Sequence, residues 1–428
     1  MNFRKKYSIG KEKAFKFRSP KNNRLLIDLV KLLLPLFNRL IVKVVEIEVN
    51  QEELSRLKNL KTHRVILTPN HPALDWTVIF HLSKLAGQDF NYLAAKEVFE
   101  QAPPGGAWFL QRLGAYSIVR GTADRTSFMM TRKLLQEGKN WLVIFPEGLS
   151  YWLNDVVLAF QQGPAQLAFW ALEDLSKQNQ LTPLYIVPVA IKYAYLQDMR
   201  PEIESSLMRL ERKLSLREKS QNMTLYNRLR QVGETVLRAN EKFYNLQPSP
   251  DASLNDRIQL IKGFIVSRVA EALEFKLSPN QTFQDQIRAM FNLLDRIVHS
   301  DVAGSEYEKQ LHLQRQQGWL DLYNELWKAQ DFIAVSDGYV RESLSAERFL
   351  EVLGRLELEV FEKIRIWGPR KAMVKIGEKI NLDDYFPRYR QDKRGTLNEV
   401  TMLLESSVKQ MLGEFRQLTN PVEPLGKG

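Results

Sequence analysis

The residues of this sequence best suited to chemistry are a histidine and a carboxylate four positions apart, His71 and Asp75. A carboxylate beside an imidazole fixes the ring tautomer and stabilises the imidazolium that forms on proton uptake. If a helix begins at or just after His71, this spacing places both side chains on one helical face. The pair is therefore a candidate general base. A structural role is the alternative, in which Asp75 occupies the first helical turn and His71 or Asn70 caps it.

Three more charged side chains stand at the ends of apolar runs: Lys96, Arg120, and Glu147, which precedes Gly148. The runs are 91–96, 114–120 and 141–148. A guanidinium at a strand end is suited to bidentate capture of phosphate or carboxylate, although a surface ion pair is the simpler use. Several strand ends that deliver His, Lys, Arg and Glu together form a more specific signal than any one of them.

An α/β arrangement is needed to bring these side chains together. The run 65–67 predicts a buried strand that Pro69 ends, followed by a helix over 73–85 that stops at Gly87. Further helices are expected at 126–137 and after Pro164, and further strands over the three runs above and 185–191. Because open α/β sheets place their sites at the carboxyl ends of strands, we expect the polar residues to meet at that edge.

The overall composition limits the partners and the chemistry. A chain of 428 residues allows two or three domains, and a net charge of +11 favours an anionic partner such as a phospholipid surface, nucleic acid or an acidic carrier protein. The chain has no Cys and only five scattered His, so we expect no disulfide, thiol nucleophile or metal site. No basic motif with interleaved aromatic residues supports nucleic-acid binding, so nucleic acid is not expected as a partner.

The first fifty residues predict contact with a membrane. Residues 1–24 form a basic arm with nine Lys or Arg against Glu12 alone, and each basic residue near anionic lipid contributes about 1 kcal/mol. Charges and Pro35 interrupt the apolar segment 25–50, which predicts one or two interfacial amphipathic helices, not a spanning helix or a signal peptide. We expect peripheral or monotopic association with the cytoplasmic side of a membrane; a solvated arm and a packed helix are the alternatives.

The second half of the chain predicts a helical bundle over 197–368. Apolar stripes recur at helical spacing, at Leu225, Leu229, Val232 and Val236, at Ile258, Ile261, Ile265 and Val269, at Ile287, Met290, Leu294 and Ile297, and at Phe349, Leu353, Leu356 and Val360. A strand pattern returns at 372–382, before a last helix over 397–418. We therefore expect the bundle to be inserted into a discontinuous α/β domain, with parts 51–196 and 369–428.

Together these residues resemble the glycerolipid acyltransferase family, of the 1-acylglycerol-3-phosphate acyltransferase type. The matching blocks are Asn70-His71…Asp75, Gly114…Arg120, Phe145-Pro146-Glu147-Gly148 and Ile186-Val187-Pro188-Val189, with Lys96 where the family often has a lysine. The resemblance covers 60–195 and 370–415. Two departures stand: three residues, not four, separate His71 from Asp75, and Gly148 is followed by Leu149 where the family usually has Thr-Arg-Ser.

The resemblance implies a membrane-associated O-acyltransferase with a mixed sheet flanked by helices. His71 would take the proton from an acceptor hydroxyl that attacks an acyl thioester, and Asp75 would orient His71. The implied substrate-binding residues are Asn70, Lys96, Arg120, Glu147 and Gly148. Arg120, joined by Lys96, would hold a phosphate, and Glu147 would organise the acceptor or its basic neighbours. No metal, acyl-enzyme or cofactor is implied beyond the co-substrate, an acyl-CoA or acyl carrier protein thioester.

The implied acceptor is a lysophospholipid or a glycerol-phosphate, foremost 1-acylglycerol-3-phosphate. The shortened His71–Asp75 spacing motivates an alternative, a catalytically silent acyltransferase-like protein that binds lipid or serves as a scaffold.

Overall fold

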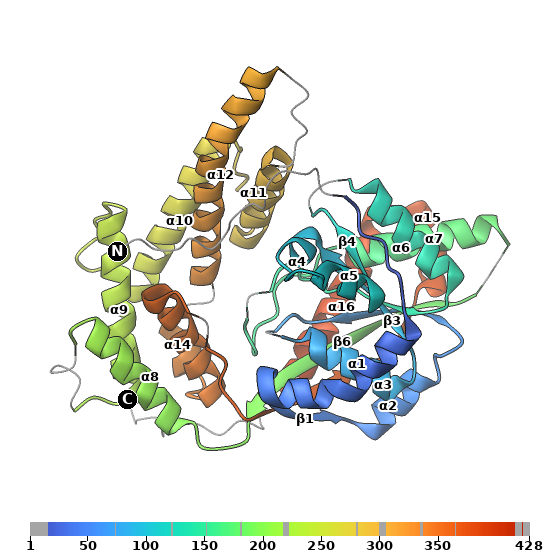
Figure 1. Ribbon diagram of the computed structural model, residues 1–428, viewed down its shortest axis with the longest axis horizontal. Helices are drawn as coiled ribbons and strands as arrows, with labels where there is room; N and C mark the ends of the chain where they lie inside the picture. The colour runs from blue at the N-terminus through green and yellow to red at the C-terminus, as the bar shows by residue number, and fades with distance from the viewer. Residues whose placement is uncertain are drawn as a thin grey trace.

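The structure is a computed structural model of the chain. It describes residues 16–415 and Val422, apart from Ala73, 121–122, Tyr151, 180–181, 217–221, Asn280, 299–304, 334–336 and Ile364. Most of the basic arm expected over 1–24, and the end of the segment expected over 369–428, lie outside the described residues. A sheet with its helices occupies one side of the molecule, and a group of helices occupies the other (Figure 1).

An eight-stranded mixed sheet forms the α/β part, in the order β1-β7-β6-β2-β5-β3-β4, with β8 paired to β6. The strands are β1 Val44–Val49, β2 Arg64–Pro69, β3 Phe90–Ala95, β4 Ala115–Ile118, β5 Trp141–Val143, β6 Leu184–Tyr195, β7 Arg370–Ile376 and β8 Ile380–Asn381. Strands β2 to β6 run parallel, so the carboxyl ends of β2, β3, β4 and β5 share one edge. Strand β7 is antiparallel to β6 and parallel to β1. The α/β prediction is confirmed.

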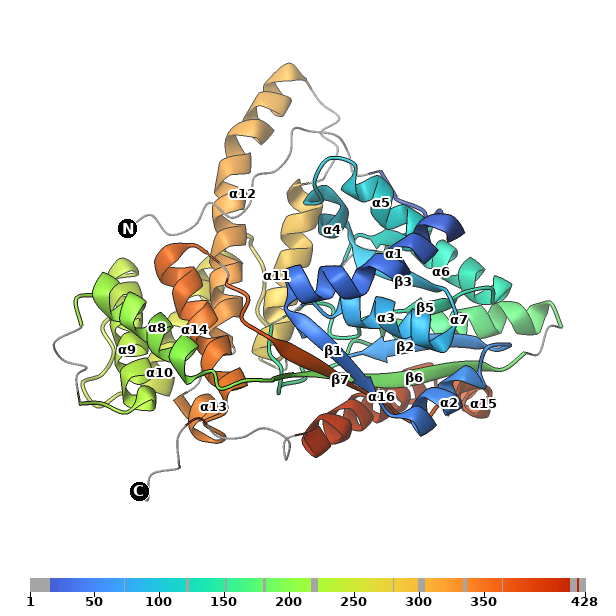
Figure 2. The same cartoon turned by 60° about the horizontal axis from the view of Figure 1, so that its bottom comes forward.

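Helices cover both faces of the sheet (Figure 2). The flanking helices are α2 Gln51–Lys58, α3 Trp76–Ala86, α6 Arg125–Glu137, α7 Gly163–Lys177, α15 Phe386–Gln391 and α16 Lys393–Phe415. In β2, Val65 and Leu67 pack into the core beneath α2 and α3, whereas Ile66 packs into the core beneath α7 and α16. Because both faces are buried, the strand is a continuous apolar run in the sequence.

Local backbone chemistry sets the ends of α3. The helix ends at Gly87, whose φ of 64° is in the left-handed region that glycine adopts at little cost. Its start differs from the prediction, since it begins at Trp76 and not at Ala73. Leu74 has a φ of 60°, which a helix does not accommodate, so the turn after His71 runs on for longer than the sequence pattern indicates.

The segment expected to be amphipathic helix over 25–50 is only partly helical. Helix α1 (Arg24–Phe37) and a π-helical turn (Asn38–Val42) fill its first part. Residues 44–49 are instead the edge strand β1, so the helical prediction is wrong there. The physical reason is pairing with β7, which the chain reaches only near its other end. No helix within the described residues has the length and apolar character needed to cross a bilayer.

The residues between β6 and β7 form helices, as their apolar stripes predict. These helices are α8 Arg200–Lys213, α9 Leu225–Phe243, α10 Leu254–Ala272, α11 Phe283–Val298, α12 Glu306–Ile333, α13 Asp337–Arg341 and α14 Ala346–Phe361. Apolar side chains from these helices share one core, which Leu149, Leu153 and Leu158 of the α/β part join. The helical block is therefore packed against the loop that follows β5.

The register of β6 explains where the helical block lies. The first half of β6 pairs with β2 up to the match of Val189 with Pro69. The second half runs past the end of β2 and pairs with β7, up to the match of Tyr195 with Arg370. The β6–β7 ribbon therefore extends beyond the carboxyl edge of the parallel strands. Since the helical block leaves and rejoins the ribbon at its tip, it covers that edge (Figure 1).

A buried ion network fixes the helical block to β6. The Asp155 carboxylate lies 2.6 Å from Lys192 Nζ of β6 and 2.9 Å from Arg348 Nε of α14. Beside it, the Asn154 side chain exchanges two hydrogen bonds with the Tyr193 backbone of β6. The loop after β5 thus joins the sheet to the helices.

Candidate active site

Asn70 fixes the end of β2, from which the candidate site begins. Its side-chain amide donates to the Ile191 carbonyl at 3.0 Å and its side-chain oxygen accepts from the Ile191 N–H at 2.7 Å. Asn70 is buried, so the structure places this expected substrate-binding residue between β2 and β6. Asn70 therefore holds the strand end that presents His71 at the carboxyl edge.

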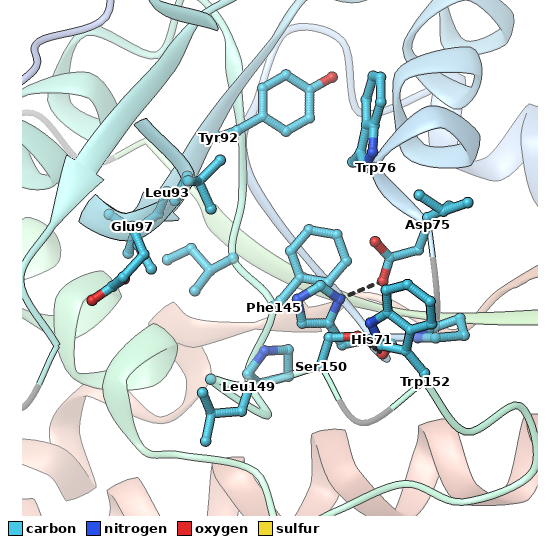
Figure 3. A pocket seen from close by; sticks show the side chains of 18 of the residues that line it. His71, Asp75, Trp76, Tyr92, Leu93, Glu97, Phe145, Leu149, Ser150 and Trp152 are labelled. Atoms are coloured by element: carbon cyan, nitrogen blue, oxygen red, sulfur yellow. Dashed lines mark hydrogen bonds and ion pairs between the residues drawn. The ribbon is translucent and has the colours of Figure 1, made fainter. Parts of the chain in front are cut away.

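His71 and Asp75 form the expected pair, with Nδ1 and Oδ2 2.5 Å apart (Figure 3). Asp75 stands at the N-cap position of α3 but uses its carboxylate on His71. Leu74 adopts a left-handed backbone conformation in the turn between the two residues, at a cost of about 1–2 kcal/mol. The contact therefore forms although only three residues separate His71 from Asp75. The His71 side chain is 27 % exposed and stacks on Phe145, with ring centroids 4.4 Å apart. Because Nδ1 faces Asp75, Nε2 is the ring nitrogen available to a ligand.

Glu147 holds the backbone of His71. One carboxylate oxygen accepts from the His71 N–H at 2.8 Å, and the other accepts from the Leu158 N–H at 3.0 Å. Ser150 Oγ donates to the His71 carbonyl at 3.0 Å, a contact that sequence reasoning missed. The loop after β5 therefore binds both the N–H and the carbonyl of His71, and Glu147 is placed to position the histidine.

The surroundings adjust the basicity of His71. Burial lowers the pKa of its imidazole, but the charge and hydrogen bond of Asp75, helped by the charge of Glu147, outweigh burial and raise the pKa above its ordinary value. Burial also raises the pKa of Glu147 to about 7. An imidazole with a raised pKa is a stronger base, so the site favours proton uptake at Nε2.

Arg120 presents a cation to the same space. Its Nη1 donates to the Gly148 carbonyl at 3.0 Å, and its Nη2 lies 3.3 Å from Glu97 Oε2. Gly148 has a φ of 72°, which permits the turn that aims this carbonyl at Arg120. The charge of Arg120 also lowers the pKa of His71, and both side chains line the same cavity.

Lys96 is buried beneath the residues that line this space. It begins the short helix α4 (Lys96–Glu100) and is 1 % exposed. Its Nζ is 3.7 Å from Oδ1 of Asp295 in α11. The structure thus brings His71, Asp75 and Arg120 to one space and buries Lys96 against the helical block. Neither Glu97 nor Asp295 stands out in the sequence, because nothing in it relates α4 to α11.

A cavity of about 1140 Å³ opens beside His71, and both parts of the molecule line it. Its apolar wall includes Phe80, Tyr92, Leu93, Phe109 and Ile118 of the α/β part, and Phe291, Trp327, Leu350, Leu358 and Trp367 of the helical block or the segment after it. The short helix α5 (Gly106–Arg112) contributes Phe109. The volume exceeds that of a typical drug-sized site, so the cavity suits a long apolar molecule with a polar end near His71 and Arg120.

Among the residues that the structure describes, no three His, Asp or Glu side chains are grouped as metal ligands would be. The site brings together a base, His71, a cation, Arg120, and a large apolar space.

Comparison with known proteins gives one finding. Residues 46–192 match a family model described as acyltransferase. No curated protein matches the chain. The matched segment runs from β1 into β6 and contains His71, Asp75, Lys96, Arg120 and Glu147. This match confirms an acyltransferase domain over about a third of the chain, as the resemblance to the 1-acylglycerol-3-phosphate acyltransferase type predicts.

Proposed function

We propose that this protein moves an acyl chain from an acyl thioester to a hydroxyl of a lysophospholipid or glycerol-phosphate, with 1-acylglycerol-3-phosphate as the preferred acceptor. The observation that carries the proposal is the 2.5 Å contact of His71 with Asp75 at the wall of a large apolar cavity. The cavity also receives Arg120, so base, cation and apolar space occur together.

In this reaction Nε2 of His71 takes the proton of the acceptor hydroxyl. The oxygen attacks the thioester carbonyl carbon, the C–S bond breaks, and the imidazolium returns the proton to the leaving thiolate. Asp75 orients the ring and stabilises the imidazolium. General-base action of this kind contributes about 10²–10⁴-fold. The donor would be acyl-CoA or acyl carrier protein, and the proposal needs no other cofactor.

The choice of a phosphate-bearing acceptor is supported by Arg120. A planar guanidinium binds phosphate oxygens in pairs, and the Gly148 carbonyl fixes its orientation. In a glycerol-phosphate only a few bonds separate the phosphate from the free hydroxyl. Arg120 would therefore hold the phosphate while His71 meets the hydroxyl. Lys96, which the resemblance places on the phosphate beside Arg120, is buried and paired with Asp295, so the proposal assigns the phosphate to Arg120 alone.

Membrane association is supported by the outer surface of α1. Several of its leucines point outward, with Leu25 84 % exposed and Leu32 70 % exposed. Phe37, at the end of α1, contacts Trp76 with ring centroids 6.0 Å apart, and Trp76 lines the cavity. An apolar surface thus leads from α1 to the cavity. With a net charge of +11, we propose that it rests on the anionic, cytoplasmic face of a membrane.

The test is acyl transfer by the full chain, followed by mass spectrometry of lipids. A panel of lysolipid and glycerol-phosphate acceptors is incubated with acyl-CoA and acyl carrier protein thioesters. His71→Ala should lower turnover at least a hundredfold without reducing vesicle binding. His63→Ala is the matched control, because His63 precedes β2 and lies at the opposite end of that strand.

Two outcomes would contradict the enzyme reading: unchanged turnover in His71→Ala, or no turnover by the parent chain with any acceptor. Retained vesicle binding without turnover would favour the alternative, a catalytically silent lipid-binding or scaffold protein.

A further inference from the structure

A cluster of four charged side chains lies where the helical block meets the candidate acceptor site. Lys96 and Glu97 come from α4, Arg120 follows β4, and Asp295 comes from α11 of the helical block (Figures 1 and 2). Lys96 and Asp295 are 1 % and 2 % exposed. The cluster is the point where the two parts of the molecule share buried charge beside the cavity.

The contacts in the cluster run from the helical block to the cavity. Asp295 Oδ1 lies 3.7 Å from Lys96 Nζ, and Glu97 Oε2 lies 3.3 Å from Arg120 Nη2. Arg120 and Glu97 both line the cavity. Burial and the neighbouring Glu97 carboxylate raise the pKa of Asp295 to about 7, whereas the charges of Lys96 and Arg120 lower it. Asp295 therefore acts on both Lys96 and Glu97, and Glu97 in turn contacts Arg120.

Charge balance explains why Asp295 matters. A buried ammonium without a counter-ion costs several kcal/mol, so Lys96 requires a nearby carboxylate. Glu100 also acts on Lys96 but is exposed to water, whereas Asp295 is buried with it. Without the Asp295 charge, we expect Lys96 to form an ion pair with Glu97, the next residue in the chain. Glu97 would then no longer contact Arg120, and the guanidinium would keep only its hydrogen bond to the Gly148 carbonyl.

We propose that Asp295 is a positioning residue for the acceptor site: it neutralises Lys96, so that Glu97 stays on Arg120 and holds the guanidinium toward the cavity. The helical block thereby sets the affinity for an anionic acceptor headgroup. This inference rests on the proposed role of Arg120 in binding the acceptor phosphate.

The first measurement is steady-state kinetics of Asp295→Asn in the full chain, carried out well above pH 7 so that the Asp295 carboxyl of the parent is ionised. Asparagine keeps the shape and removes the charge. KM for 1-acylglycerol-3-phosphate should rise about tenfold, the scale on which neighbouring charges couple. The saturating kcat and the KM for the thioester should change less than about twofold. Arg296→Gln, the next residue on α11 and exposed, should leave all three values unchanged.

A rescue variant separates positioning from mere support of the fold. Lys96→Met combined with Asp295→Asn removes both buried charges and frees Glu97 again. KM of the double variant should return to within about threefold of the parent. If Asp295→Asn lowered kcat and raised both KM values together, or if Lys96→Met brought no recovery, the positioning role would be overturned.

A binding measurement tests the positioning role of Asp295 independently of turnover. Thermal protection by 1-acylglycerol-3-phosphate is compared with protection by the uncharged monoacylglycerol. The parent should prefer the phosphate-bearing lipid, and Asp295→Asn should lose that preference. Equal loss for both lipids, no loss, or a parent without the preference overturns the inference. Absence of turnover in the parent would refute the proposed reaction. The thermal-protection measurement would still test whether Asp295 positions Arg120, because it does not depend on turnover.

Discussion

At the scale of single residues, Asp75 sets how basic His71 is. Its charge and hydrogen bond keep the pKa of His71 above the ordinary value, despite burial. Asp75→Asn removes the charge, so the pKa of His71 should fall. A general base works only while neutral, so activity is lost as the pH drops through this pKa. The acid limb of kcat/KM should therefore move to lower pH, while the rate falls about 10²–10⁴-fold.

The measurement is kcat/KM from pH 5 to 9 with the phosphate-bearing acceptor. Asp198→Asn is the control, because Asp198 is an exposed carboxylate far along the chain that pairs with Arg200. An acid limb that stays in place in Asp75→Asn would mean that another group titrates there.

Residue type and strand position were enough to predict where His71, Asp75 and Arg120 lie. The reason is geometric, because the carboxyl ends of parallel strands meet at one edge. Side-chain direction is not encoded in this way. Glu147 turned out to hold the His71 backbone, and Lys96 is buried against α11, because those contacts depend on loops and on a helix distant in sequence.

At the scale of elements, α1 presents an apolar face to the outside. Its inner residues, Ile27 and Leu34, pack near α3, so they hold the helix in place. Three outward leucines are replaced together in the variant Leu25→Ser, Leu32→Ser, Leu36→Ser. Since burying a leucine contributes about 1.5–3 kcal/mol, the loss of each should weaken vesicle binding about tenfold or more.

Vesicle sedimentation with anionic lipid measures this binding, and thermal unfolding checks that the variant folds. Met402→Ser is the matched control, because Met402 is an equally exposed apolar residue on α16. Equal loss of binding in both variants, or none in the triple variant, would remove α1 as the membrane contact.

Strand β1 shows why one element escaped prediction. Glu46 and Glu48 alternate with Ile47 and Val49, which is a strand pattern. Because the apolar segment over 25–42 precedes this short alternation, the sequence pattern predicts that the helix continues through it. What decides the outcome is pairing with β7, and no local pattern announces a partner near the other end of the chain.

At the scale of the whole molecule, the sequence was sufficient to indicate a helical block within an α/β chain. Helical stripes interrupt the strand pattern, and the pattern returns at 372–382. Its placement was not predictable. It follows from how far β6 runs past Pro69 before the chain leaves the sheet at Tyr195, and strand length cannot be read from apolar residues to that accuracy.

The attachment of this block to the sheet depends on Asp155, which gives the last prediction. Its carboxylate compensates both Lys192 of β6 and Arg348 of α14, all three of them buried. Asp155→Asn keeps the shape but removes the carboxylate paired with Lys192, and leaves Arg348 with only the exposed carboxylate of Glu342. Removing one partner of a buried ionic group costs about 3–5 kcal/mol, so the free energy of unfolding should fall by that amount.

Denaturant unfolding of the full chain measures the loss. Asp198→Asn, at an exposed pair near the same junction, should change stability by less than about 0.5 kcal/mol. The loss in Asp155→Asn should appear first in the helical block, because Arg348 would be released from the sheet. An Asp155→Asn protein within about 1 kcal/mol of the parent would show that apolar packing alone, through Leu149, Leu153 and Leu158, holds the block over the carboxyl edge.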